Sequence, residues 1–93
     1  MPDMQYKLER VAAGHFILDV YGTPLDNAVQ LQIRQCGGVT NITPPQPPLR
    51  KEQPGTVHVI DVSRETITSD RVAGRVRGRI LRVLNAYYSE LHE

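Results

Sequence analysis

The sequence is poor in cysteine and in large aromatic residues. Its 93 residues include one cysteine, one phenylalanine and no tryptophan. A single cysteine excludes an intramolecular disulfide, so a reducing, cytoplasmic environment is expected. No apolar run approaches the roughly 18 residues of a membrane-spanning helix, and residues 1–10 lack the basic and apolar regions of a signal peptide. We therefore expect a cytoplasmic protein that has no membrane contact.

The chain also lacks an excess of charge of either sign. Eleven lysines and arginines stand against ten aspartates and glutamates, which gives a net charge of +1. The protein therefore has no strong global field to attract nucleic acid. Hydrophobic and charged contents of 40% and 23% are typical of a globular domain. A chain of this length favours one domain over residues 1–93, with a small core that a homo-oligomer would supplement.

Four segments show the alternation of apolar and polar residues that is typical of strands. They are residues 5–11, 15–22, 39–43 and 56–62. The last one is the clearest, with Val57 and Val59 on one side and His58 and Ile60 on the other. Between the third and fourth strands, Pro44–Gly55 has five prolines in twelve residues. This segment predicts an exposed, extended loop, because proline supplies no amide to a sheet.

Residues 24–36 are compatible with either a helix or a strand, and we interpret them as a helix. Thr23 fits the N-cap, Pro24 fits the first helical position, and Gly37 and Gly38 fit a C-terminal stop. The predicted order is then β-β-α-β-β-α. It indicates an α+β domain with a mostly antiparallel sheet and two helices on one face. The ferredoxin-like fold is the nearest common fold, with the strand from His15 beginning its β-α-β unit and the first strand at an edge.

A long amphipathic helix is predicted over residues 70–91. Its expected core face consists of Val72, Val76, Ile80, Val83, Leu84, Tyr87 and Leu91. Beside this face runs a stripe of arginines three or four residues apart: Arg71, Arg75, Arg79 and Arg82. No acidic residue lies between Arg71 and Arg82. The guanidinium groups therefore repel one another unless anions or carboxylates separate them.

The arginine stripe is compatible with three interpretations. The stems can cover apolar surface while the charged heads stay in water. The guanidinium groups can also bind an acidic protein partner or a nucleic-acid backbone. Gly74 and Gly78 lie on the predicted outer side and would let another backbone approach closely. Arg77, Leu81 and Tyr88 continue this outer side in the prediction, and we count them among the partner-binding residues.

No arrangement of residues indicates catalysis or a cofactor. Cys36 is expected at the C-terminal end of the first helix, where the dipole disfavours a thiolate. His15, His58 and His92 have no ligand spacing, and no second cysteine supports a metal site. The glycine pair lacks the pattern of a phosphate-binding loop. We therefore predict a protein that is not an enzyme, with no metal and no cofactor.

The segment LDNAVQLQIRQCGGVTNITP, from Leu25 to Pro44, is similar to the end of CpcD-like phycobilisome linker domains. The likeness is carried by Gly37 and Gly38 and by the closing residues Ile42, Thr43 and Pro44. It covers residues 5–45 and implies two strands, a helix and a closing strand. It also implies a small adaptor that docks on a larger assembly.

Together these features predict a small non-enzymatic interaction or adaptor module. It would use the arginine-rich helix to dock on a protein partner, for which an acidic surface is one interpretation, or to self-associate as a homo-oligomer. The alternative is a nucleic-acid-binding regulator that uses the same arginines. The near-neutral charge and the single phenylalanine argue against that alternative.

Overall fold

The computed structural model describes residues 5–11, 14–21, 24–48 and 52–91. The elements in chain order are β1 (Tyr6–Val11), β2 (His15–Val20), α1 (Asn27–Arg34), β3 (Val39–Ile42), β4 (Thr56–Val62), α2 (Arg64–Thr68) and α3 (Asp70–Leu91). The strands form one sheet in the order β1-β2-β4-β3, and every neighbouring pair is antiparallel. The structure confirms an α+β domain with an antiparallel sheet, and it places β1 at an edge.

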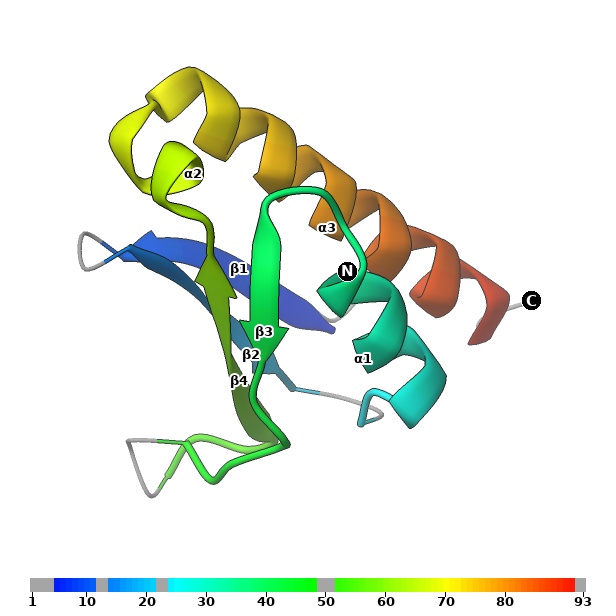
Figure 1. Cartoon of the computed structure of the whole chain (residues 1–93). Helices are drawn as coiled ribbons and strands as arrows, with labels where there is room; N and C mark the ends of the chain where they lie inside the picture. Colours follow the sequence, from blue (N-terminus) through cyan, green and yellow to red (C-terminus); the bar gives the residue numbers. More distant parts are fainter. Residues whose placement is uncertain (1–4, 12–13, 22–23, 49–51, 92–93) are drawn as a thin grey trace.

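Alternation along the strands decides which face of the sheet meets the helices. Both α1 and α3 lie on the same side of the sheet (Figure 1). The buried apolar side chains from strands and helices form one cluster, whose central members are Leu8, Phe16, Leu18, Val20, Ile33, Ile60, Val76, Ile80 and Leu84. Burial of each such side chain stabilises the fold by about 1.5–3 kcal/mol relative to its exposure. The opposite face of the sheet has no helix among the described elements.

His58 is a polar residue within this core. It is fully buried on the helix side of β4. Its Nδ1 lies 2.9 Å from the carbonyl oxygen of Thr43. Because a carbonyl only accepts hydrogen bonds, the ring carries its proton on Nδ1 and donates it there. The hydroxyl of Thr43 in turn accepts from the amide of Val59, so this pair joins the end of β3 to β4.

Helix α1 begins later than the sequence indicates. The N-cap is Asp26, whose carboxylate accepts a hydrogen bond from the amide of Val29 at 2.9 Å. The predicted cap, Thr23, lies outside the described residues. Pro24 precedes the helix, and Leu25 is buried against the core before the first turn begins. Aspartate is a strong N-cap residue, so the helix starts at Asn27 and not at Pro24.

The short helix α2 was not predicted. Ser63 caps it through a bond from the amide of Thr66, and the two hydroxyls lie 2.8 Å apart. The side chain of Thr66 is buried. A five-residue helix carries no hydrophobic period, so its sequence signal was limited to the capping residue at its start.

Helix α3 has the predicted bounds, but its buried face is rotated. The buried positions are Ala73, Val76, Ile80, Leu84 and Tyr88. Three residues expected on the core face, Val72, Val83 and Tyr87, are only partly buried. The side chain of Leu91 lies outside the described part. The rotation brings the side of the helix that holds Leu81 and Tyr88 toward the sheet.

The proline-rich segment is more closely joined to the sheet than a free loop. The amide of Gln46 donates to the carbonyl of Val57 at 3.0 Å, and the amide of Val57 donates back at 2.8 Å. Gln46 can do this because it is a non-proline residue between Pro45 and Pro47 and retains its amide. The side chain of Gln53 also donates to Asp19 Oδ1 at 3.3 Å. Within the described residues 44–48 and 52–55, the segment follows the edge of β4 for part of its length.

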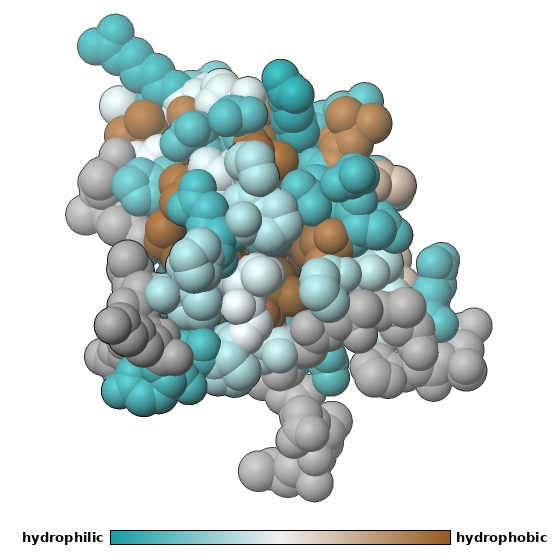
Figure 2. All heavy atoms as spheres, turned by 90° about the horizontal axis from the view of Figure 1, so that it is seen from below, coloured by the Kyte–Doolittle hydropathy of each residue, from teal (hydrophilic) through white to brown (hydrophobic). Residues whose placement is uncertain are grey.

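The surface at the lower end of the molecule is mixed in polarity. Seen from below, its hydrophobic residues form small separate patches between polar ones (Figure 2). A docking site is therefore not marked by hydrophobicity at this end. Charge and shape are better guides to one.

Gly38 is required at the turn between α1 and β3. Its φ is +93°, and a Cβ built there would lie 2.4 Å from Cγ2 of Val76 and 3.0 Å from Oγ1 of Thr66. Its carbonyl also accepts the amide of Ser63 at 2.8 Å. The turn is therefore packed tightly against α3 and α2.

We expect Gly38→Ala to lower the free energy of unfolding by at least about 2 kcal/mol, from left-handed strain and the overlap with Val76. Urea denaturation followed by circular dichroism measures this change. Gly74→Ala is the control, because a Cβ there meets nothing within 4 Å. It should stabilise the protein by about 0.5–1 kcal/mol through helix propensity. Equal midpoints for the two variants would contradict the tight turn.

Candidate functional site

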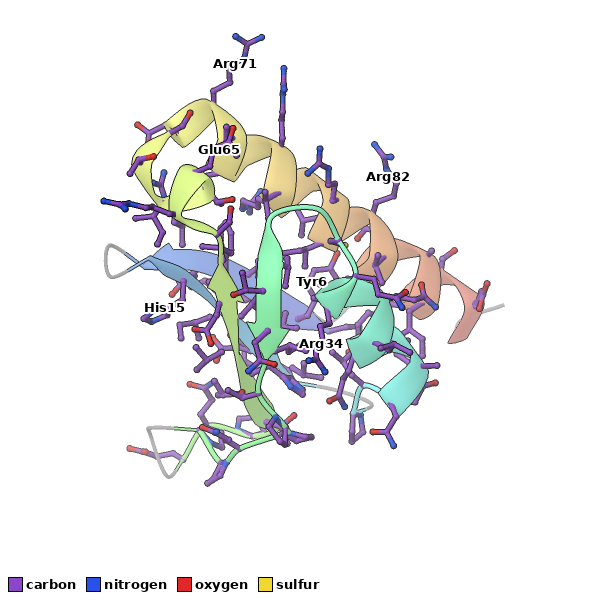
Figure 3. The ribbon with its side chains drawn as sticks, viewed as in Figure 1. Tyr6, His15, Arg34, Glu65, Arg71 and Arg82 are labelled. Atoms are coloured by element: carbon purple, nitrogen blue, oxygen red, sulfur yellow. The ribbon has the colours of Figure 1, made fainter. Side chains whose placement is uncertain are left out.

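The arginine stripe lies on the outer side of α3. All four of its residues, Arg71, Arg75, Arg79 and Arg82, are exposed. The side chains of Arg71 and Arg82 point away from the body of the molecule (Figure 3). Among the described residues, the two ion pairs are Lys7–Glu9 and Arg10–Asp70. No arginine of the stripe therefore has a carboxylate partner in the part of the chain that the structure describes. We call these four residues the arginine face.

Arg79 is fixed against the glycine turn. Its Nη1 donates to the carbonyl oxygen of Gly37 at 2.8 Å. A Cβ at Gly37 would lie 2.9 Å from the same nitrogen, so glycine leaves room for the guanidinium group. The contact joins α3 to the segment that links α1 and β3. It also restricts the rotamers of Arg79 before any ligand arrives, which lowers the entropy cost of binding.

Arg75 and Arg79 share a concavity with the turn. The hollow measures about 290 Å³ and is lined by Gly37, Gly38, Ser63, Glu65, Thr66, Val72, Arg75, Val76 and Arg79. It lies where α3, α2 and the glycine turn meet. The volume accommodates a single side chain better than a drug-sized ligand, whose pockets span roughly 300–1,000 Å³.

The chemistry of the concavity suits one carboxylate. Guanidinium groups offer paired N–H donors in a plane, which match the two oxygens of a carboxylate. Glu65 contributes a negative charge to the same lining, and it lies on α2 beside the first turns of α3 (Figure 3). This charge opposes a multiply charged phosphate more strongly than a single carboxylate.

The outward position expected for Tyr88 is wrong. Its side chain is only 5% exposed. The ring stacks on Tyr6 of β1 with centroids 5.3 Å apart, and it meets Tyr87 edge-on at 5.1 Å. The hydroxyl of Tyr6 donates to Asn85 Oδ1. Because α3 is rotated toward β1, this aromatic cluster is part of the core and not of a docking surface.

The rotation of α3 also changes the positions of Leu81 and Arg77 relative to the arginine face. Leu81 is partly buried and packs against the core, so it is not part of an outer apolar patch. Arg77 is exposed, but it lies on the side of α3 near Tyr6. Burial raises the pKa of Tyr6, and the charge of Arg77 opposes this effect in part. Arg77 is thus separated from the arginine face. The sequence pattern placed Leu81 outside because the core arc was centred too far toward Val72.

Gly74 and Gly78 lie on the outer side as predicted. Both are exposed, and a Cβ at either position would meet nothing within 4 Å. They leave α3 with a smooth surface beside the arginine face. That surface permits another chain to approach the helix closely, although nothing in the fold itself requires glycine there.

Cys36 does not have the environment of a nucleophile. Its thiol donates to the carbonyl of Gln32 at 3.4 Å. Burial raises the pKa of the Cys36 thiol, and the charge of Arg79 only partly opposes this. A raised pKa leaves less thiolate at neutral pH. In the described residues, no three His, Cys, Asp or Glu side chains lie close enough together to hold a metal ion.

No family model matches the sequence, and no curated protein or solved structure matches it significantly. The resemblance to CpcD-like linker domains therefore rests only on the residues that carry it. None of the described helices is both long and apolar enough to cross a bilayer.

Burial raises the pKa of Tyr88 to about 12, and the neighbouring Tyr87 and Tyr6 add to the effect. Between the ordinary value of about 10 and this value, the folded protein retains a proton that the unfolded chain releases. The stabilisation is therefore complete below about pH 10 and is lost as the pH rises toward about 12, by up to about 1.4 kcal/mol per pH unit.

We expect Tyr88→Phe to show a shallower loss of stability than the wild type over this range, because the variant has no ionisable group at the site. Chemical denaturation at a series of alkaline pH values measures the two slopes. Identical slopes would contradict the burial of this hydroxyl.

Proposed function

We propose that this chain is a small non-enzymatic interaction module whose arginine face binds an acidic surface of a protein. The observation that carries the proposal is the absence of any carboxylate partner for the stripe among the described residues, where Arg10 and Lys7 are both paired. Four cations on one side of one helix repel one another. An acidic partner removes this repulsion and supplies the charge-assisted hydrogen bonds that the guanidinium groups can make.

The fixed position of Arg79 distinguishes this proposal from a solvated flank. An arginine that only shields apolar surface keeps its head in water. The head of Arg79 instead bonds to the Gly37 carbonyl and shares a concavity with Arg75. This arrangement supports a preformed carboxylate site at the centre of the arginine face. Arg71 and Arg82 extend it along the helix at either end.

The aromatic residues argue against a nucleic-acid ligand. Single-stranded nucleic acids bind through exposed aromatic rings that stack on bases, together with cationic grooves. Phe16 and Tyr88 are buried, and Tyr6 stacks on Tyr88. These rings are therefore committed to the core. Glu65 also brings a negative charge into the concavity that a phosphate would enter. Protein is the better-supported partner, and nucleic acid is a distinct outcome of the test below.

We also propose that the fold is a ferredoxin-like sandwich. The segment from β2 to α3 supplies a strand, a helix, two strands, the short α2 and the long α3, with β4 between β2 and β3. In this assignment β1 takes the remaining edge beside β2. The cytoplasm is the proposed location, because the single cysteine has no partner within the chain.

We expect Arg75→Glu to weaken binding of a fluorescent Asp/Glu-rich peptide at least tenfold, which corresponds to about 1.4 kcal/mol. Adding Arg79→Glu should abolish detectable binding. Fluorescence anisotropy at physiological ionic strength measures both effects. Arg34→Glu is the matched control, since Arg34 is an exposed helical arginine on α1. It should retain affinity to within about twofold, with every variant checked by its unfolding midpoint.

Equal losses in Arg75→Glu and Arg34→Glu would show that net charge alone drives binding, and the proposed site would be wrong. The same assay with a generic DNA duplex and a single-stranded RNA tests the alternative function. Tight binding of either one, falling steeply with salt as counterions are released, would favour a nucleic-acid regulator.

A further inference from the structure

The open face of the sheet has a charge opposite to that of the arginine face. It comprises the side chains that point away from the helices: Lys7, Glu9, His15, Ile17, Asp19, Val57, Val59 and Asp61. His15 lies on the side away from α3 (Figure 3). Among the described residues of this surface there are three carboxylates and one ammonium group. That ammonium, Lys7 Nζ, is already 2.7 Å from Glu9 Oε1.

The strand register fixes the layout of this face. Ile17 lies between Glu9 of β1 and Val59 of β4, and Asp19 lies between Lys7 and Val57. Asp61 is opposite His15 at the far end. Ile17, Val57 and Val59 therefore form a half-buried apolar centre with carboxylates around it. The proline-rich loop forms one wall of a hollow of about 320 Å³ here, through Gln46, Pro47 and Gln53.

We infer that the acidic partner of the arginine face is the open sheet face of a second copy of this chain. This inference rests on the proposed function and names its partner. The two surfaces lie on opposite sides of one protomer, because α3 covers the other side of the sheet. Each copy then offers its helix to one neighbour and its sheet to another.

The dimensions of the two surfaces match. At 1.5 Å per residue, Arg71 and Arg79 are about 12 Å apart along α3. Asp61 is paired with His15, which lies four residues before Asp19 on β2. At 3.3 Å per residue, Asp61 and Asp19 are therefore about 13 Å apart along the strand direction. A helix lying along the sheet would bring its arginines over these carboxylates. The stems would cover Ile17 and Val59, and the open Gly74 and Gly78 would allow close approach.

Symmetric pairing is disfavoured at both surfaces. Two helices packed through the arginine face would bring eight guanidinium groups together, counting four from each copy. Two sheets packed face to face would bring Glu9, Asp19 and Asp61 against their own counterparts. The head-to-tail contact avoids both repulsions. Such a heterologous contact leaves one free surface at each end and builds chains of increasing length.

The test uses two variants that each lose one surface. The helix variant is Arg75→Gln with Arg79→Gln, and the sheet variant is Asp19→Asn with Asp61→Asn, because neutral side chains remove each surface without making the two altered surfaces complementary to each other. Sedimentation velocity from about 1 to 100 μM, the range of weak protein association, should show wild-type oligomers that grow with concentration. Each variant alone should be a monomer, with association weakened at least tenfold. An equimolar mixture should form a dimer that grows no further, because each variant supplies the surface that the other lacks.

Several results would overturn the inference. They are a monomeric wild type at 100 μM, a variant that retains wild-type oligomers, and a mixture that stays monomeric while both variants are folded. The sheet variant also separates this inference from the proposed function, because its arginine face is intact. If it and the wild type bind the acidic peptide but the wild type does not self-associate, the function stands and the inference fails. If the peptide does not bind and the mixture does not pair, both fail.

Discussion

The burial of α3 against one face of the sheet is the interaction on which the other features depend. Val76, Ile80 and Leu84 are fully buried in the cluster that the strands supply. Val76 also lies directly beside Gly38, so the position of the helix determines the shape of the turn. With that register fixed, Arg79 reaches the Gly37 carbonyl and Arg75 lines the same hollow. The charged surface is therefore a consequence of core packing.

Much of the fold follows from local sequence patterns. The alternation in β2 and β4 predicts that both segments are strands and which of their side chains share a face. The second strand ends at Val20, before the predicted residue 22. The bounds of α3 follow from its long apolar period. The sequence does not indicate how far α3 is rotated about its axis, since apolar residues such as Val72 and Tyr88 occur on both flanks of the core arc. In the fold, the rotation brings Tyr88 onto the ring of Tyr6, which is distant in sequence.

The candidate site was predictable only where it depends on a single element. The arginine stripe and the outward glycines are properties of one helix, so the sequence reveals them directly. The concavity combines α3 with the glycine turn and the unpredicted α2, and only tertiary structure brings these together. The sequence did not indicate a role for Glu65, because nothing in a short polar segment shows that this segment packs beside α3. The resemblance to linker domains did include the glycine pair, but it did not indicate that an arginine packs over it.

The proline-rich segment has a consequence for solubility. β3 is an edge strand of four residues with a register irregularity between Val39 and Asn41. Directly after it, Thr43 and Gln46 donate their amides to β4, whereas the adjoining prolines Pro44, Pro45, Pro47 and Pro48 have no amide to offer a neighbouring strand. At the other edge, β1 carries Lys7, Glu9 and Arg10. Short, irregular, proline-flanked and charged edges are the means by which sheet proteins avoid uncontrolled strand addition. The sheet is thereby protected from amyloid-like growth along its hydrogen-bonding direction.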